Sequence, residues 1–215
     1  MSQPADVFSG ALQALIARGY GAANALLFGW NAGNDYSASH YYPPTIPDAV
    51  YASGASALVA DYVIYVPFIC RFTHTFTKLA FYNTGAGDSG DLIRMGIYDS
   101  TGGRPVNRLV DGGELTMTGA AAVNEATISQ QLIAGRLHFL AITANGAITG
   151  YRVAGAVTGA WRSALDLGAL TTATLPDSIG FAESRAYAAL PATAGTLIAI
   201  TPGVTTNQPL FWIKG

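Results

Sequence analysis

Charged side chains are scarce in this sequence. Asp, Glu, Lys and Arg make up only 11% of the 215 residues, whereas apolar residues make up 50%. An ordinary soluble protein carries roughly a quarter charged residues. Because so little charge is left to cover a surface, we expect other subunits to cover part of it. With a net charge of −2 and no basic run, the sequence also predicts no nucleic-acid partner.

Cysteine is nearly absent, since Cys70 is the only one. An internal disulfide is therefore excluded, and we expect a buried, inert thiol inside the apolar run YVIYVPFIC. No stretch approaches the roughly 20 apolar residues that span a bilayer. The start MSQPADVFSG lacks the basic and apolar segments of a secretory signal. We therefore expect no membrane insertion and no signal-directed secretion.

A catalytic set is also lacking. The string GAGDSGDL at residues 85–92 resembles a serine-protease nucleophile site, but Ser89 is not followed by the Gly-Gly-Pro of that family. Asp91 stands where a lipase nucleophile elbow needs glycine. Acyl transfer also needs a histidine base with an orienting acid, and His74, in RFTHTFTK, lacks the Ala-Ala-His-Cys setting of those proteases. We interpret the string as a turn and predict no catalytic residue.

Metal-binding spacings such as His-x-x-x-His or Cys-x-x-Cys do not occur, so no metal site and no cofactor are predicted. A calcium site built from loop carboxylates stays open as an alternative, with the candidates Asp88, Asp91, Asp99 and Asp111. A glycosidase would need two acids facing one cleft. Nearly all acids lie at expected turns, with Glu125 and Glu183 as the mid-strand candidates. Polysaccharide hydrolysis is therefore the weakest alternative.

The N-terminal part differs from the rest of the chain. Residues 4–18 are predicted to form a short helix, because Pro4 suits a first turn and Asp6 suits the positive end of the helix dipole. Residues 31–48 are polar, aromatic and rich in proline, which favours an extended path. We predict that residues 1–48 form a helix and a docking arm. The side chains predicted to contact a neighbouring subunit or docking partner are Phe8, Leu12, Leu15, Ile16, Tyr41 and Tyr42.

From residue 49 the pattern becomes that of strands. The apolar run at 57–72 indicates a buried strand, in which Pro67 predicts a bulge or an unpaired edge. TKLAFYN alternates, with Leu79 and Phe81 on one face and Lys78 and Tyr82 on the other. LIRMGIYD alternates, with Ile93, Met95 and Ile97 on one face and Arg94, Gly96 and Tyr98 on the other. ELTMTG, NEATIS, RLHFLAIT and PLFWIKG follow as strand candidates. STGGRP, DGG, LIAG and ANGA are expected turns, and SIGFAESRAYAALPATAG is expected to hold another strand or two. Residues 49–215 are therefore predicted to form one all-β sandwich or barrel.

Aromatic residues beside planar donors suggest a sugar site. Trp161 and Arg162 lie in a loop-like stretch, near Tyr151 and Arg152. The apolar face of a pyranose stacks on an aromatic ring while its hydroxyl groups need hydrogen bonds. We predict these four residues as glycan-binding. The alternative, that the rings pack against a neighbouring subunit or the domain's own core, stays open.

Residues 58–195 resemble a module of tailed-phage virion proteins, among them tail fibres, baseplate-associated proteins and head fibres. The shared elements are YVPF, a TGAGxxG loop, RMGIYDSTGGRP, LVDGG and EATIS. They are followed by an L-x-x-G turn, the LHFLAI strand and AYAALPAT. The first 48 residues lie outside the resemblance.

The resemblance implies a jelly-roll-like antiparallel β-sandwich, often trimeric, that is displayed on a virion and contacts host-surface glycans without catalysis. With the N-terminal helix and arm, this leads to the hypothesis of a small phage or phage-like fibre or spike. Such a protein would be made in the host cytoplasm and would bind other virion proteins. The alternative is a stand-alone carbohydrate-binding module.

Overall fold

The computed structural model describes much of the chain after residue 39. The described residues are 40–42, 50–54, 58–70, 72–85, 90–117, 119–154, 180–200, 209 and 211–215. They belong to one compact unit, Tyr36–Gly215. The predicted N-terminal helix lies outside them. No helix in the described part of the chain is long and apolar enough to span a membrane.

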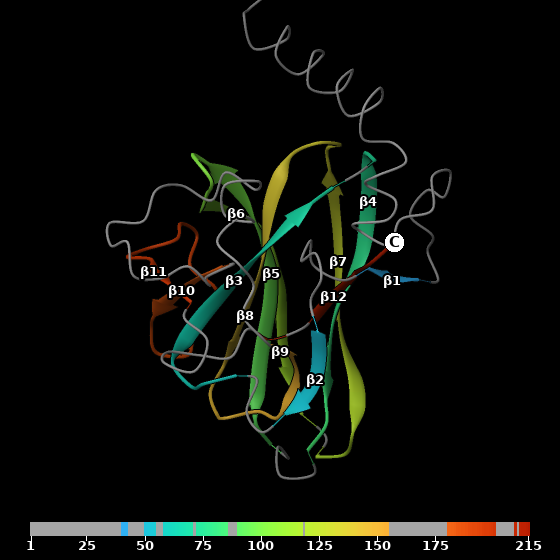
Figure 1. Ribbon diagram of the computed structural model, residues 1–215, viewed down its shortest axis with the longest axis vertical. Coiled ribbons are helices and arrows are strands. Elements are labelled where there is room, and N and C mark those ends of the chain that lie inside the picture. The colour runs from blue at the N-terminus through green and yellow to red at the C-terminus, as the bar shows by residue number, and fades with distance from the viewer. Residues whose placement is uncertain are drawn as a thin grey trace, which may run out of the picture. The chain divides into compact units, whose positions relative to one another are not determined.

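The described residues form two antiparallel six-stranded sheets (Figure 1). In sheet A the order is β1 (Tyr41–Tyr42), β12 (Phe211–Lys214), β4 (His74–Asn83), β9 (Gly150–Ala154) and β2 (Val50–Gly54), and β7 (Ala122–Leu132) also pairs with β4. In sheet B the order is β11 (Ile198–Ala199), β10 (Phe181–Ser184), β3 (Tyr62–Ile69), β8 (Leu137–Ala144), β5 (Leu92–Thr101) and β6 (Arg104–Thr116). The prediction of an all-β fold is confirmed for the described residues.

The two sheets share one apolar core. Leu79 and Phe81 of β4 belong to the same buried cluster as Ile93, Met95 and Ile97 of β5. These are the residues that the alternating patterns of the two segments assigned to one face, and each is 0% exposed. Because successive strand residues point to opposite faces, each strand presents one row to this shared core. The arrangement is consistent with a β-sandwich.

The outer face of sheet B carries a second, smaller core. Tyr65, Tyr98, Phe139 and Phe181 of the sheet cluster there with Leu190. Leu190 comes from residues 185–197, a segment that we call the strap. The strap is bonded to the edge of β6: the Arg108 amide donates to the Ala192 carbonyl (2.9 Å) and the Ala194 amide to the Val106 carbonyl (2.8 Å). Sheet B is therefore covered on both faces in this region.

Gly96 lies beneath the strap, and we expect Gly96→Ala to be destabilising. A Cβ at this position would lie 2.6 Å from Leu190 Cδ1 and 2.6 Å from the Val110 carbonyl oxygen. Overpacking of this kind costs about 1–3 kcal/mol, measurable by urea denaturation. In a Leu190→Ala background the penalty should shrink without vanishing, because the Val110 carbonyl belongs to the backbone. If the penalty of Gly96→Ala were the same in the Leu190→Ala background as in the wild type, Leu190 would not pack on Gly96.

The DGG element was predicted as a turn, and this prediction is wrong. Residues 111–113 lie inside β6, where the pairing with β5 shifts between Arg94 and Gly96. Gly113 has a φ of 81°, and its amide donates to Asp111 Oδ1 over 2.9 Å. A positive φ at glycine beside an extra residue is how a β-bulge is built. The ELTMTG segment consequently continues β6 through Thr116 instead of beginning a new strand.

Pro67 lies beside an unpaired strand edge, which is the second of the two predicted alternatives. It pairs in regular register with Phe139 of β8, so β3 has no bulge there. On the other edge of β3, the pairing with β10 ends at Tyr65. Among the described strands none pairs with that edge at Pro67, which suits a residue that has no amide hydrogen to donate.

The last strand of the chain lies inside a sheet. PLFWIKG was predicted as a strand, and its residues Phe211–Lys214 form β12 between β1 and β4. Tyr41 and Tyr42, which the sequence assigns to the docking arm, form β1 and pair with Lys214 and Ile213. The end of the predicted arm is therefore part of sheet A.

Candidate functional site

The predicted glycan-binding residues are described only in part. Trp161 and Arg162 lie outside the described residues, and so do the predicted contact residues Phe8, Leu12, Leu15 and Ile16. Tyr151 and Arg152 lie in β9, opposite Ser53 and Ala52 of β2. The structure therefore describes the predicted site only at β9, and β9 leads to the outer face of sheet A.

Tyr151 does not stand alone on that face. Its ring stacks on the ring of Tyr82 with the centroids 5.3 Å apart and the planes inclined by 30°. Both side chains are half-buried. Tyr82 follows Lys78 and Ala80 along β4, and Trp212 of β12 lies opposite Ala80. The sequence alternation of TKLAFYN indicated that Tyr82 and Lys78 share a face, but it gave no sign that Tyr151 or Trp212 would join them.

Tyr41 and Tyr42 take different roles although they are neighbours. Tyr42 packs against the shared core. Tyr41 is 39% exposed, and its hydroxyl donates to Glu125 Oε1 of β7. Lys214 Nζ lies 4.7 Å from the centroid of the Tyr41 ring, which is a cation–π contact. Tyr41 therefore connects the first strand of sheet A to the strands on the far side of β12.

Glu125 is the centre of the polar contacts on this face. Its carboxylate accepts a hydrogen bond from Lys78 Nζ at Oε2 and one from Lys214 Nζ at Oε1, the latter over 3.2 Å. The Glu125 side chain is 22% exposed. Burial by itself raises the pKa of this carboxyl, but the hydrogen bonds from Lys78 and the other two donors outweigh it and lower the pKa to about 2. Glu125 therefore stays ionised, as a structural anion that joins β7, β4, β12 and β1.

This cluster predicts a loss of stability in acid. The pKa of Glu125 is about 2 in the folded protein against an ordinary value of 4.5, so its contribution is full above pH 4.5 and is lost as the pH falls toward 2. Solvent-accessible ion pairs contribute about 0.2–1 kcal/mol each, so the cluster accounts for roughly 1–2 kcal/mol. Glu125→Gln should lower stability at pH 7 and flatten this part of the stability curve between pH 5 and 2. An identical acid dependence in the variant would contradict this role.

Glu183, the second mid-strand acid, is also fully engaged. It is 3% exposed and accepts hydrogen bonds from the Tyr65 hydroxyl (2.9 Å), the Gly195 amide (2.9 Å) and Arg185 Nε (2.6 Å). Glu183 lies in β10 of sheet B, whereas Glu125 lies in β7 of sheet A. The two carboxylates that the sequence offered as an acid pair therefore belong to different sheets.

Two of the acids that were weighed as calcium ligands, Asp99 and Asp111, hold backbone amides, and Asp91 lies just before β5. Asp99 Oδ1 accepts from the Asn107 amide over 2.6 Å, which braces the β5–β6 hairpin. Asp111 Oδ1 accepts from the Gly113 amide in the bulge of β6. Asp88 lies outside the described residues. Within the described ranges, no three His, Cys, Asp or Glu side chains gather closely enough to hold a metal ion.

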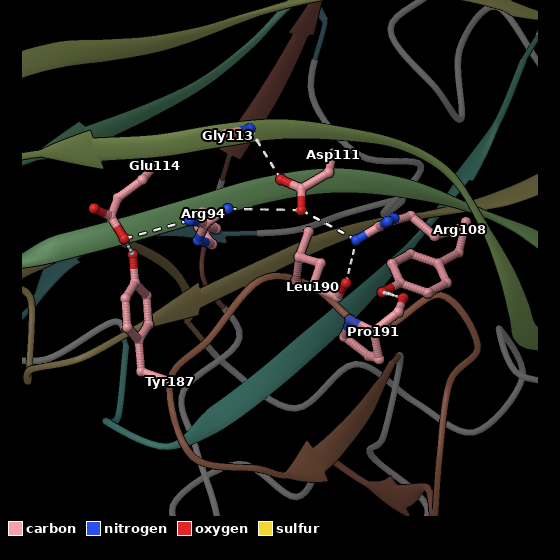
Figure 2. Close-up of polar contacts among 9 residues, drawn as sticks. Arg94, Arg108, Asp111, Gly113, Glu114, Tyr187, Leu190 and Pro191 are labelled. Atoms are coloured by element: carbon pink, nitrogen blue, oxygen red, sulfur yellow. Dashed lines mark hydrogen bonds and ion pairs between the residues drawn. The ribbon is translucent and has the colours of Figure 1, made fainter.

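Residues of three sequence motifs meet in one network beneath the strap (Figure 2). Arg94 of RMGIYDSTGGRP lies between Asp111 of LVDGG, with 3.8 Å from Nη1 to Oδ2, and Glu114, with 3.5 Å from Nη2 to Oε2. Arg108 Nη1 bridges Asp111 Oδ2 over 3.2 Å and the Leu190 carbonyl of AYAALPAT.

The Tyr98 hydroxyl adds a bond to the Pro191 carbonyl over 2.5 Å. This bond and the Arg108 bond to Leu190 both end on strap carbonyls, on consecutive residues. The network thus ties the strap to β5 and β6, and the motifs that meet in it serve the fold here.

A scan against protein-family models finds no family that matches the chain, and a search of curated proteins finds no matching relative.

Proposed function

We propose that the chain is a non-enzymatic structural protein of a phage or phage-like virion, a small fibre or spike. Residues 1–48 would dock it to other virion proteins, and a jelly-roll-like β-sandwich would be displayed for contact with the host surface. The protein would be made in the host cytoplasm and assembled as a homo-oligomer, with a trimer favoured.

The network beneath the strap is the observation that carries this proposal. Arg94, Asp111 and Leu190 come from three separate motifs of the phage-like resemblance, and they contact one another through two arginines (Figure 2). Because these motifs act together in one structural network, they support an architecture shared with the virion modules that the sequence resembles. The low charge of the sequence supports burial of further surface between subunits.

The hydrogen bonding of the two mid-strand carboxylates supports a purely binding role. Glu125 and Glu183 each bind several donors, so neither carboxylate is arranged as a general acid or a nucleophile. The outer face of sheet A, with Tyr41, Tyr82, Tyr151 and Trp212, offers ring surface suited to contact with another molecule.

Electron microscopy of particles, together with deletion of residues 1–35, which leaves β1 in place, tests the proposal. We expect the full chain to be visible at the head, collar or tail tip, and the truncated chain to fold but to be missing from particles. The free chain should run as an oligomer in light scattering. A monomer that binds neither virion proteins nor glycans would refute the proposal.

The alternative is a stand-alone carbohydrate-binding module. It is favoured by one observation, the stacked pair of Tyr82 and Tyr151 at the predicted sugar site. A glycan-array signal that is lost in Tyr151→Ala and Trp161→Ala, with the circular dichroism unchanged, would support it. Glycan binding that survives both substitutions, or no binding together with loss of assembly after deletion of the arm, would favour the virion role.

A further inference from the structure

Two buried polar atoms beneath the strap have no hydrogen-bond partner among the residues that the structure describes. They are Arg94 Nε and Thr143 Oγ1. Thr143 is 2% exposed. Leaving such a group unsatisfied costs about 1–3 kcal/mol, so a second group that satisfies both atoms would be stabilising.

The two atoms belong to neighbouring side chains. Arg94 of β5 and Thr143 of β8 are directly paired in the antiparallel register, so their side chains lie side by side on one face. Across the sheet, Val63 of β3 pairs with Thr143, and Glu114 of β6 pairs with Arg94. The row therefore places a buried donor and a buried hydroxyl next to each other in the middle of sheet B.

Tyr187 of the strap is hydrogen-bonded at both ends of this row. Its backbone amide donates to Asp61 Oδ1 over 3.0 Å, just before β3, and its hydroxyl donates to Glu114 Oε2 over 3.1 Å on β6. The residue therefore links the segment before β3 to β6, and its hydroxyl meets Glu114 beside Arg94 (Figure 2). Burial raises the pKa of Tyr187 to about 12, so its hydroxyl stays a donor at neutral pH.

The charges around the row select a neutral occupant. Arg94 already faces the carboxylates of Asp111 and Glu114. An anion would be repelled by these two acids, and a cation would be repelled by the guanidinium group. A water molecule can accept from Nε and donate to the threonine hydroxyl, and buried waters typically make two to four such bonds.

We propose that Arg94 Nε and Thr143 Oγ1 together bind a buried water molecule beneath Tyr187, and that this water exchanges slowly with the solvent. This water is a structural part of the attachment between the strap and sheet B. It completes the hydrogen bonding of the arginine whose other nitrogens hold Asp111 and Glu114.

A high-resolution crystal structure of the full chain tests the site. We expect a solvent peak at about 2.7–3.2 Å from both atoms. The same peak should persist in Thr143→Ser, which keeps the hydroxyl, and disappear in Thr143→Val. A direct bond between Nε and Oγ1 with no solvent peak, a dry site, or an anomalous signal from an ion would overturn the proposal.

Stability measurements give a second test. Thr143→Val should lower the melting temperature by about 2–4 °C, the shift expected for a change of one hydrogen bond in a chain of this size. Thr143→Ser should stay closer to the wild type. A valine variant as stable as the wild type would refute the site, and if the valine variant does not fold, the wild-type crystal structure still decides.

Discussion

Ile97→Ala is expected to lower the free energy of unfolding by about 2–5 kcal/mol. Ile97 is 0% exposed and belongs to the core that the two sheets share. It lies between Val110 of β6 and Leu140 of β8 in the register of sheet B. Truncation removes buried apolar surface and leaves a cavity that strands held on both sides cannot close. Denaturation in urea or guanidinium chloride measures the loss.

Two further substitutions give this measurement its controls. Ile97→Val removes a single methylene group and should cost about 0.5–1.5 kcal/mol. Val123→Ala, at a side chain that is 48% exposed, should change stability by no more than about 0.5 kcal/mol. If Ile97→Ala were as mild as Val123→Ala, the shared core would not lie where the two sheets place it.

Glu183→Ala is expected to lower the free energy of unfolding by about 2–4 kcal/mol, because it removes the acceptor of buried hydrogen-bond donors. Tyr65 and the Gly195 amide both donate to Glu183 Oε2, and the alanine variant removes this shared acceptor. Burial raises the pKa of Tyr65 well above its ordinary value, so its hydroxyl keeps its proton and cannot escape the penalty by ionising. Because Gly195 belongs to the strap, the loss should also loosen that segment.

Glu183→Gln separates hydrogen bonding from charge. The amide oxygen can still accept from Tyr65 and Gly195, and Arg185, whose side chain is 42% exposed, can turn to solvent. We therefore expect the glutamine variant to retain most of the stability. Hydrogen exchange at the Gly195 amide should speed up in the alanine variant and much less in the glutamine variant. Equal exchange in both would show that the carboxylate does not hold the strap.

The sequence predicted strands well where alternation was uninterrupted. Ile93, Met95 and Ile97 alternate with Arg94, Gly96 and Tyr98, and the first three indeed face the shared core. Tyr98 was assigned only to the opposite face, yet it is 0% exposed. The reason is the strap, which covers that face from a distant part of the sequence, and no local pattern encodes such coverage.

Glycine-rich elements were harder to interpret. STGGRP forms a tight connection between β5 and β6, with φ of 57° at Gly102 and 73° at Gly103, as its glycines predicted. DGG has a similar composition and lies within a strand. A positive φ at glycine suits a turn and a bulge equally, so only the pairing with β5 decides between them.

The candidate site was predictable only in fragments. Glu125 stood out as a mid-strand acid, and Tyr151 and Tyr41 as aromatic residues with contact roles. That Tyr82 would stack on Tyr151, or that Lys214 would reach Glu125, depends on which strands are neighbours. Strand order in a sheet brings together residues that are far apart along the chain.

By itself the sequence determined the all-β character of the described residues and the rows of apolar side chains for the core. It also determined the lack of the basic charge that is typical of nucleic-acid-binding proteins. These follow from composition and from a side-chain period of two, which are properties of short stretches. The tertiary structure alone decided that β12 lies between β1 and β4, that the strap buries Tyr98, and that Arg94 and Thr143 meet beneath Tyr187. Those contacts join segments distant along the chain, and their geometry is set when the strands pair and the two sheets pack.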